Sequence, residues 1–148
     1  MNLKAIINLF SILVLLFSLS YVFPIVVSLV FNDNSLYLFL PTFIFVGALG
    51  LIGFFFTKGV QRDLSAKDGF VIIVMFWLVL SLAGSIPFYL SGMSPIDSFF
   101  ESMSGITTTG ATVISNIETL PESLKFYRQL LQWTVSYTHL RAHETSEN

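Results

Sequence analysis

Three long apolar blocks constrain this chain more than any other feature of its sequence. They cover residues 5–31, 36–57 and 69–90, and none of them contains Asp, Glu, Lys or Arg. The second block has about 22 residues, which as a helix is about 33 Å long and enough to cross a hydrocarbon core of about 30 Å. The blocks therefore predict an all-α membrane protein with at least three crossing helices.

The first block also has features of a secretory signal, because Lys4 precedes its apolar run. A signal core is about 7 to 15 residues long, whereas this block is nearly twice that length and lacks a clear small-x-small cleavage site. A retained crossing helix with a kink at Pro24 fits better. Residues 1–57 are thus predicted to form two leading transmembrane helices, separated by a polar turn at 32–35.

Composition narrows the function classes. Of the 148 residues, 54% are hydrophobic and 11% charged, against about 25% charged in ordinary soluble domains. Seven Lys and Arg are spread along the chain, so there is no basic patch for nucleic acid, and DNA and RNA are excluded as partners. The chain has no Cys and hence no disulfide or thiolate metal site. Membrane lipid is the expected surrounding.

Charged loops set the expected orientation. Residues 58–68 form the most charged loop, and Lys4 lies near the amino end, whereas the turn at 32–35 holds no cation. Because cytoplasmic loops carry an excess of Lys and Arg, the amino terminus and the 58–68 loop are predicted to be cytoplasmic.

Small residues mark one face of the second block. Gly47, Gly50 and Gly53 recur every three residues. They indicate either a close contact with another helix or glycines that are merely tolerated in lipid, since the spacing is not the four-residue small-xxx-small pattern.

A segment too short to cross follows the third block. Residues 96–106 make about 16 Å of helix, which is half the length needed, and Pro95 and Asp97 favour a helix start there. The run 107–110, Thr-Thr-Thr-Gly, disfavours further helix and predicts an extended strand that presents oxygens to a monovalent cation. A short helix with such an irregular end can lie in a membrane only if that end is buried in protein or lines a cavity.

The sequence from Phe99 to Thr112, followed by Leu120-Pro121 and by residues 126–133, resembles the first pore repeat of the Trk-type potassium uptake proteins. Within the Trk/Ktr/HKT superfamily it is most similar to the TrkH membrane subunits. Residues 67–77 and the leading helices fit the same family in order and spacing.

The resemblance implies potassium uptake through a filter built from four such repeats, with residues 58–133 as the first, and no catalysed reaction. Thr108 and Thr109 would supply potassium-coordinating oxygens, and Thr107, Gly110 and Ala111 would form the surrounding filter backbone. It also implies a multi-pass protein of the cell (inner) membrane, a cytosolic nucleotide-binding regulatory subunit and a homodimer, with no cofactor beyond potassium as the transported ion. Symport with another ion and channel-like passage both stay open.

Other readings compete with the pore. A small membrane scaffold or accessory subunit without its own pore is the main alternative, whereas a membrane enzyme lacks paired acids or a nucleophile with a base. Glu101, an acid in the middle of the short helix, is expected to be structural, hydrogen-bonded to backbone or to a neighbouring repeat, rather than an ion ligand. Lys125 and Arg128 are expected to reach out to the membrane interface.

The last residues depart from the family pattern. After Trp133 the sequence becomes polar in mid-helix, so the fourth helix is predicted to be truncated and residues 134–148 to be a non-native tail. His139 and His143 stand four apart, as in some zinc sites, but no third ligand is evident and no metal site is predicted.

Overall fold

Helices make up the whole regular structure of the part of the chain that is described. A computed structural model describes residues 3–59 and 66–144, and the side chains within 3–59 and 69–133. The elements are α1 (Leu3–Ser20), α2 (Val22–Phe31), α3 (Leu36–Phe56), α4 (Ala66–Leu90), α5 (Pro95–Ile106), the 3-10 helix η1 (Ile117–Thr119) and α6 (Glu122–Glu144). The predicted all-α class is confirmed.

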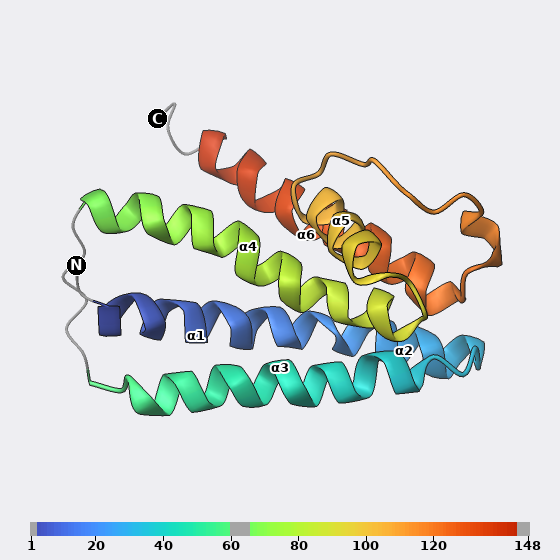
Figure 1. Ribbon diagram of the computed structural model, residues 1–148, viewed down its shortest axis with the longest axis horizontal. Helices are drawn as coiled ribbons and strands as arrows, with labels where there is room; N and C mark the ends of the chain where they lie inside the picture. Colours follow the sequence, from blue (N-terminus) through green and yellow to red (C-terminus); the bar gives the residue numbers. More distant parts are fainter. Residues whose placement is uncertain (1–2, 60–65, 145–148) are drawn as a thin grey trace.

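Three long apolar stretches run side by side along the molecule (Figure 1). Leu3–Phe31, Leu36–Phe56 and Gly69–Leu90 are each long and apolar enough to cross a membrane, which confirms the three predicted blocks. The start of α1, the end of α3 and the start of α4 lie at one end of the molecule, and α5 and α6 cover the far half of α4 (Figure 1). The predicted 58–68 loop ends earlier than expected, since α4 begins at Ala66, and residues 60–65 lie outside the description.

The first crossing stretch is broken near its middle. The kink predicted at Pro24 lies three residues earlier, at Tyr21, between α1 and α2. Pro24 has no N–H to donate to the carbonyl of Ser20, and its ring clashes with that carbonyl in a straight helix. The Tyr21 N–H instead bonds the Ser18 carbonyl at 3.1 Å, the shorter spacing of a 3-10 turn.

The glycine face of α3 packs closely on α1. A Cβ built at Gly50 lies 2.8 Å from Leu15 Cγ, and one built at Gly47 lies 3.6 Å from Ser18 Oγ. A Cβ at Gly53 meets the Ser11 hydroxyl in the same way. Of the two readings of this spacing, the close helix contact is confirmed.

An aromatic cluster joins the leading helices to the rest of the chain. Tyr127 of α6 stacks on Tyr21 with ring centroids 5.7 Å apart, and it contacts Phe39 of α3 at 5.4 Å and Phe88 of α4 at 5.5 Å. The hydroxyls of Tyr21 and Tyr127 donate to the carbonyls of Ala83 and Gly84 in α4, at 2.7 and 2.9 Å. Both tyrosines are buried with their polar ends satisfied.

The turn between α2 and α3 also holds the start of α6. One carboxylate oxygen of Asp33 accepts from the Ser28 hydroxyl at 2.6 Å and the Ser35 N–H at 3.0 Å, and the other accepts from the Ser123 N–H at 2.8 Å. Partial burial acts to raise the pKa of Asp33, but the hydrogen bonds from Ser28, Ser123 and Ser35 outweigh it and hold the pKa well below its ordinary value. Asp33 thereby supplies the negative charge that favours a helix amino terminus.

The sequence predicts that the fourth helix ends at Trp133, and this prediction is wrong, because the helical backbone continues beyond that residue. α6 remains helical to Glu144, because Arg, Ala and Glu are good helix formers and polarity alone does not end a helix. The side chains of residues 134–144 lie outside the description, as do residues 145–148, so the origin of this tail stays a prediction.

Candidate functional site

The short helix α5 begins where the sequence predicts. Ser94 is its N-cap, and Pro95 occupies the first turn. The Ser94 hydroxyl accepts from the Asp97 N–H at 3.1 Å and donates to the Asp97 carboxylate at 2.8 Å. With 12 residues, the helix is about 18 Å long and too short to cross a bilayer.

The Thr-rich end of α5 forms a turn before it becomes irregular. Thr107 is the C-cap, and Thr108 has a left-handed backbone with φ of 58°. The N–H groups of Thr107, Thr108 and Thr109 bond the carbonyls of Met103, Gly105 and Ser104 at 2.9 to 3.0 Å. The predicted extended strand is therefore wrong at Thr107 and Thr108, because the last carbonyls of α5 need donors and these residues supply them.

Two residues in this turn have backbone angles that suit glycine. Gly110 has φ of 75°, which costs it nothing. Thr108 is β-branched, and a left-handed backbone costs such a residue about 1 to 2 kcal/mol. Strain of this kind persists where the surroundings enforce one conformation and is common at functional sites.

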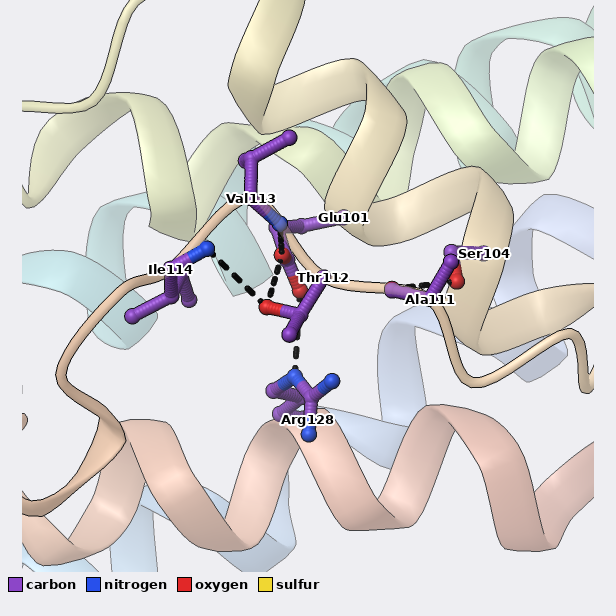
Figure 2. A network of polar contacts seen from close by, with 7 residues as sticks. All are labelled: Glu101, Ser104, Ala111, Thr112, Val113, Ile114 and Arg128. Atoms are coloured by element: carbon purple, nitrogen blue, oxygen red, sulfur yellow. Dashed lines mark hydrogen bonds and ion pairs between the residues drawn. The ribbon is translucent and has the colours of Figure 1, made fainter.

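Side chains of α5 hold the returning chain from behind (Figure 2). The Ser104 hydroxyl donates to the Ala111 carbonyl at 2.6 Å. One carboxylate oxygen of Glu101 accepts from the Val113 N–H at 2.7 Å and also from the Thr112 hydroxyl. Glu101 therefore fixes the chain two residues beyond Gly110.

Glu101 is held in turn by α6. Its second carboxylate oxygen accepts from Arg128 Nε at 3.0 Å, and the two side chains are only 1% and 8% exposed. The predicted structural role of Glu101 is confirmed. The predicted outward reach of Arg128 is wrong, because a buried carboxylate needs a compensating cation and Arg128 is the cation that faces it. Lys125 pairs with Glu122 at 2.8 Å on the surface.

The front of the turn is open. Thr108, Thr109, Gly110 and Ala111 are exposed. The Thr107 hydroxyl donates to the Met103 carbonyl at 2.7 Å and lies 2.8 Å from the Thr109 hydroxyl. Within residues 3–59 and 66–144, the carbonyls of Thr108, Thr109 and Gly110 accept no hydrogen bond. Their oxygens are therefore free to bind a ligand.

The sequence-predicted site residues are thus contiguous on one exposed turn, from Thr107 to Ala111. Sequence reasoning missed the residues behind it, which are Ser104, Thr112 and Arg128. The sequence did contain a signal for this ion pair. The short helix carries Glu101 among apolar residues, and the first turns of the next helix carry Arg128, which can neutralise it. No cluster of three His, Cys, Asp or Glu suited to a metal occurs among the described residues. The side chains of His139 and His143 lie outside that part of the chain.

Comparison with known proteins places this geometry in a family. The model of the TrkH family, described as cation transport protein, matches residues 36–140. The chain belongs to the TrkH family. The match also extends into the segment after Trp133 that the sequence predicts to be non-native.

Several relatives agree with this assignment to TrkH. The chain is 42% identical over 136 residues to the Trk system potassium uptake protein TrkH of Halomonas elongata, covering 90% of this chain and 28% of that protein. It is 38% identical to the TrkH of Escherichia coli K12 over the same length. The crystal structure of the potassium transporter TrkH from Vibrio parahaemolyticus matches with a TM-score of 0.86 and 40% identity, over 90% of this chain and 29% of that one.

Membership of the TrkH family confirms two predictions, one on the membrane and one on enzyme activity. The chain is a membrane protein of a cation transport family, and the prediction that it is not an enzyme is confirmed. It spans about 28% of the length of these curated relatives.

Proposed function

We propose that this chain contributes one repeat of a potassium uptake pore, in which the oxygens of Thr108 and Thr109 coordinate the ion. Thr107, Gly110 and Ala111 form the backbone that presents them. The observation that carries the proposal is the open turn itself, whose three carbonyls are unused while its other side is fixed by Ser104 and Glu101. Carbonyl oxygens of this kind replace the water shell of a potassium ion.

The buried pair behind the turn suits this task. A carboxylate with no partner so close to an ion path would bind a cation too tightly to release it. Arg128 compensates the charge of Glu101 at 3.0 Å, so the carboxylate positions the turn without adding net charge to it. The oxygens of one turn surround an ion on one side only. In this proposal, three further repeats in a chain of the relatives' length complete the ring.

The proposal also covers the membrane location, orientation and partners of the protein. The protein lies in the cell (inner) membrane with its amino terminus cytoplasmic, which Lys4 and Lys58 at one end of the helices support. By resemblance to the Trk systems, it forms a homodimer and binds a cytosolic nucleotide-binding regulatory subunit. A topology reporter placed after Lys67 should be cytoplasmic and one after Ser91 external, and the reverse labelling would overturn this orientation.

A chimera tests the pore. Residues 3–133 of this chain replace the aligned stretch in the TrkH of Vibrio parahaemolyticus, which is 40% identical over 136 residues, and rubidium and sodium uptake are measured in cells without other potassium uptake systems. We expect the chimera to restore uptake and Gly110→Ser to abolish it or to admit sodium. Gly92→Ser is the matched control, because Gly92 also has a positive φ, of 101°, and open space around it.

Equal uptake and selectivity in the two serine variants would remove Thr107–Ala111 from the ion path. A chimera that assembles in the membrane, carries no rubidium and still supports a co-expressed intact TrkH would favour the scaffold or accessory subunit. The 148-residue chain alone, reconstituted in liposomes, should give no rubidium flux above empty vesicles, since its single turn cannot surround an ion.

A further inference from the structure

An apolar groove lies between α1, α3 and α4, on the leading helices and away from the turn of Thr107–Ala111. Its volume is about 620 Å³. Its walls include Ile6, Phe10, Phe45, Leu49, Met75 and Val79. Ser11 is the hydroxyl-bearing residue of its lining, and that hydroxyl already donates to the Ile7 carbonyl at 2.7 Å. The groove therefore offers contacts to an apolar occupant and no hydrogen bond to a polar one.

The groove is at least as long as one leaflet of a bilayer. On α1 its lining runs from Leu3 to Val14, about 16 Å of helix, and on α4 from Val71 to Ile86, about 22 Å. Half of a hydrocarbon core is about 15 Å. The groove starts at the end of the molecule where α1 begins and extends along the helices for at least that distance.

A flexible acyl chain suits the irregular wall of this groove. It is far thinner than a helix, which with its side chains is at least about 10 Å across. What selects a lipid over a helix is the charge beside the groove.

Two lysines lie at the end of the molecule where α1 begins and α3 ends, which is also where the groove starts. Asn8 Nδ2 donates to Thr57 Oγ1 at 2.9 Å, which ties the start of α1 to the end of α3. Lys4 lies one turn before Asn8, and Lys58 directly follows Thr57. Both lysines are exposed, and among the described residues neither forms an ion pair. Basic residues beside a groove between membrane helices are the usual way of binding an anionic lipid head group.

We propose that this groove binds a phospholipid with an anionic head group, whose acyl chain lies along α1, α3 and α4 and whose phosphate sits between Lys4 and Lys58. The apolar lining holds the chain by packing, and the lysines select the head group. The groove is separate from the ion path, since its lining comes from α1, α3 and α4 and includes no residue of α5 or of the turn that follows it.

Native mass spectrometry of the purified 148-residue chain tests the proposal. The chain is mixed in detergent with phosphatidylglycerol or with phosphatidylcholine of the same acyl chains, and the fraction that keeps a lipid on activation is measured. We expect phosphatidylglycerol to be retained several-fold better. The Lys4→Gln/Lys58→Gln variant should lose this preference, whereas Lys125→Gln, which removes a surface cation elsewhere, should keep it.

A second pair of variants tests the groove itself. Val79→Trp fills the groove and should lower retention of both lipids. Val74→Trp is the matched control, because Val74 lies on the same helix, is 58% exposed and does not line the groove. Circular dichroism confirms that each variant is helical.

Three results would overturn the proposal. They are equal retention of the two lipids by the unaltered chain, equal retention in the two tryptophan variants, and a dimer that only Val79→Trp converts to monomer. The last result would make the groove an interface between copies. Because the glutamine variant alters only exposed side chains, the head-group part remains testable even if Val79→Trp does not fold.

Discussion

Replacing Arg128 by Leu should destabilise the fold, because it breaks the buried ion pair between α6 and α5. The substitution leaves Glu101 buried, with its side chain 1% exposed, and removes the cation that pairs with it. Breaking a buried ion pair on one side costs about 3 to 5 kcal/mol, because the remaining charge loses its compensation. The Val113 N–H and the Thr112 hydroxyl still donate to Glu101, which argues for the lower part of this range.

The assay is denaturant unfolding of the purified chain in mixed micelles, followed by circular dichroism. Glu101→Gln in the Arg128→Leu background removes the stranded charge and keeps an acceptor for the Val113 N–H. It should therefore recover most of the loss, and the double-mutant cycle should give a coupling energy of about 2 to 3 kcal/mol. The Val113 amide should exchange its hydrogen faster in Arg128→Leu than in the unaltered chain.

Lys125→Leu is the control for this experiment. Lys125 also lies in the first turns of α6 and pairs with an acid, Glu122, but that acid is 52% exposed. An exposed pair of this kind contributes at most about 1 kcal/mol. A loss of less than 1 kcal/mol for Arg128→Leu, or no recovery on adding Glu101→Gln, would refute the reasoning that the pair is a structural unit.

Three further predictions follow from the backbone and the turns. Gly50→Val should destabilise the pairing of α1 and α3, because even its Cβ would lie 2.8 Å from Leu15 Cγ. Gly69→Ala is its control: a Cβ there meets nothing within 4 Å, so stability should stay unchanged or rise by up to about 1 kcal/mol. Denaturant unfolding curves of the two variants make the comparison. Gly110→Asn should retain more rubidium uptake in the chimera than Gly110→Ser, because Asn tolerates a left-handed backbone better. The folded pKa of Asp33 lies below its ordinary value of 3.8. Asp33 therefore stabilises the fold fully above pH 3.8, and this stabilisation is lost as the pH falls toward the folded pKa. Asp33→Asn should abolish this contribution to acid unfolding, and an unchanged stability profile at acid pH would contradict the prediction.

Features that depend on neighbouring residues were predictable from the sequence. The crossing helices followed from the length of the apolar blocks, and the start of α5 followed from Pro95 and Asp97. The glycine spacing of α3 identified the correct face, although it left open whether a partner covered it. In each case the deciding signal lies within a few turns of one helix.

Features that depend on distant residues were not predictable. Arg128 and Glu101 are 27 residues apart, and until α6 is placed against α5 a lone Arg near a helix end is indistinguishable from one that reaches the interface. Asp33 caps a helix 90 residues later in the chain, so nothing in the 32–35 segment indicates this role. At Thr107 and Thr108, β-branching predicts an end to the helix but does not specify which irregular conformation follows.

The break at Tyr21 determines how the leading segment can fit a membrane. Leu3–Phe31 has 29 residues, about 43 Å if it were one straight helix, while the hydrocarbon core is about 30 Å thick. A rigid rod of that length would have to tilt strongly or thicken the bilayer around it. Because Tyr21 and the aromatic rings around it fasten the break to α4 and α6, α2 can take a different tilt from α1. Because α2 packs on α6 and Asp33 accepts from the Ser123 N–H, a change in the tilt of α2 is passed to α6 and, through the Arg128–Glu101 pair, to α5.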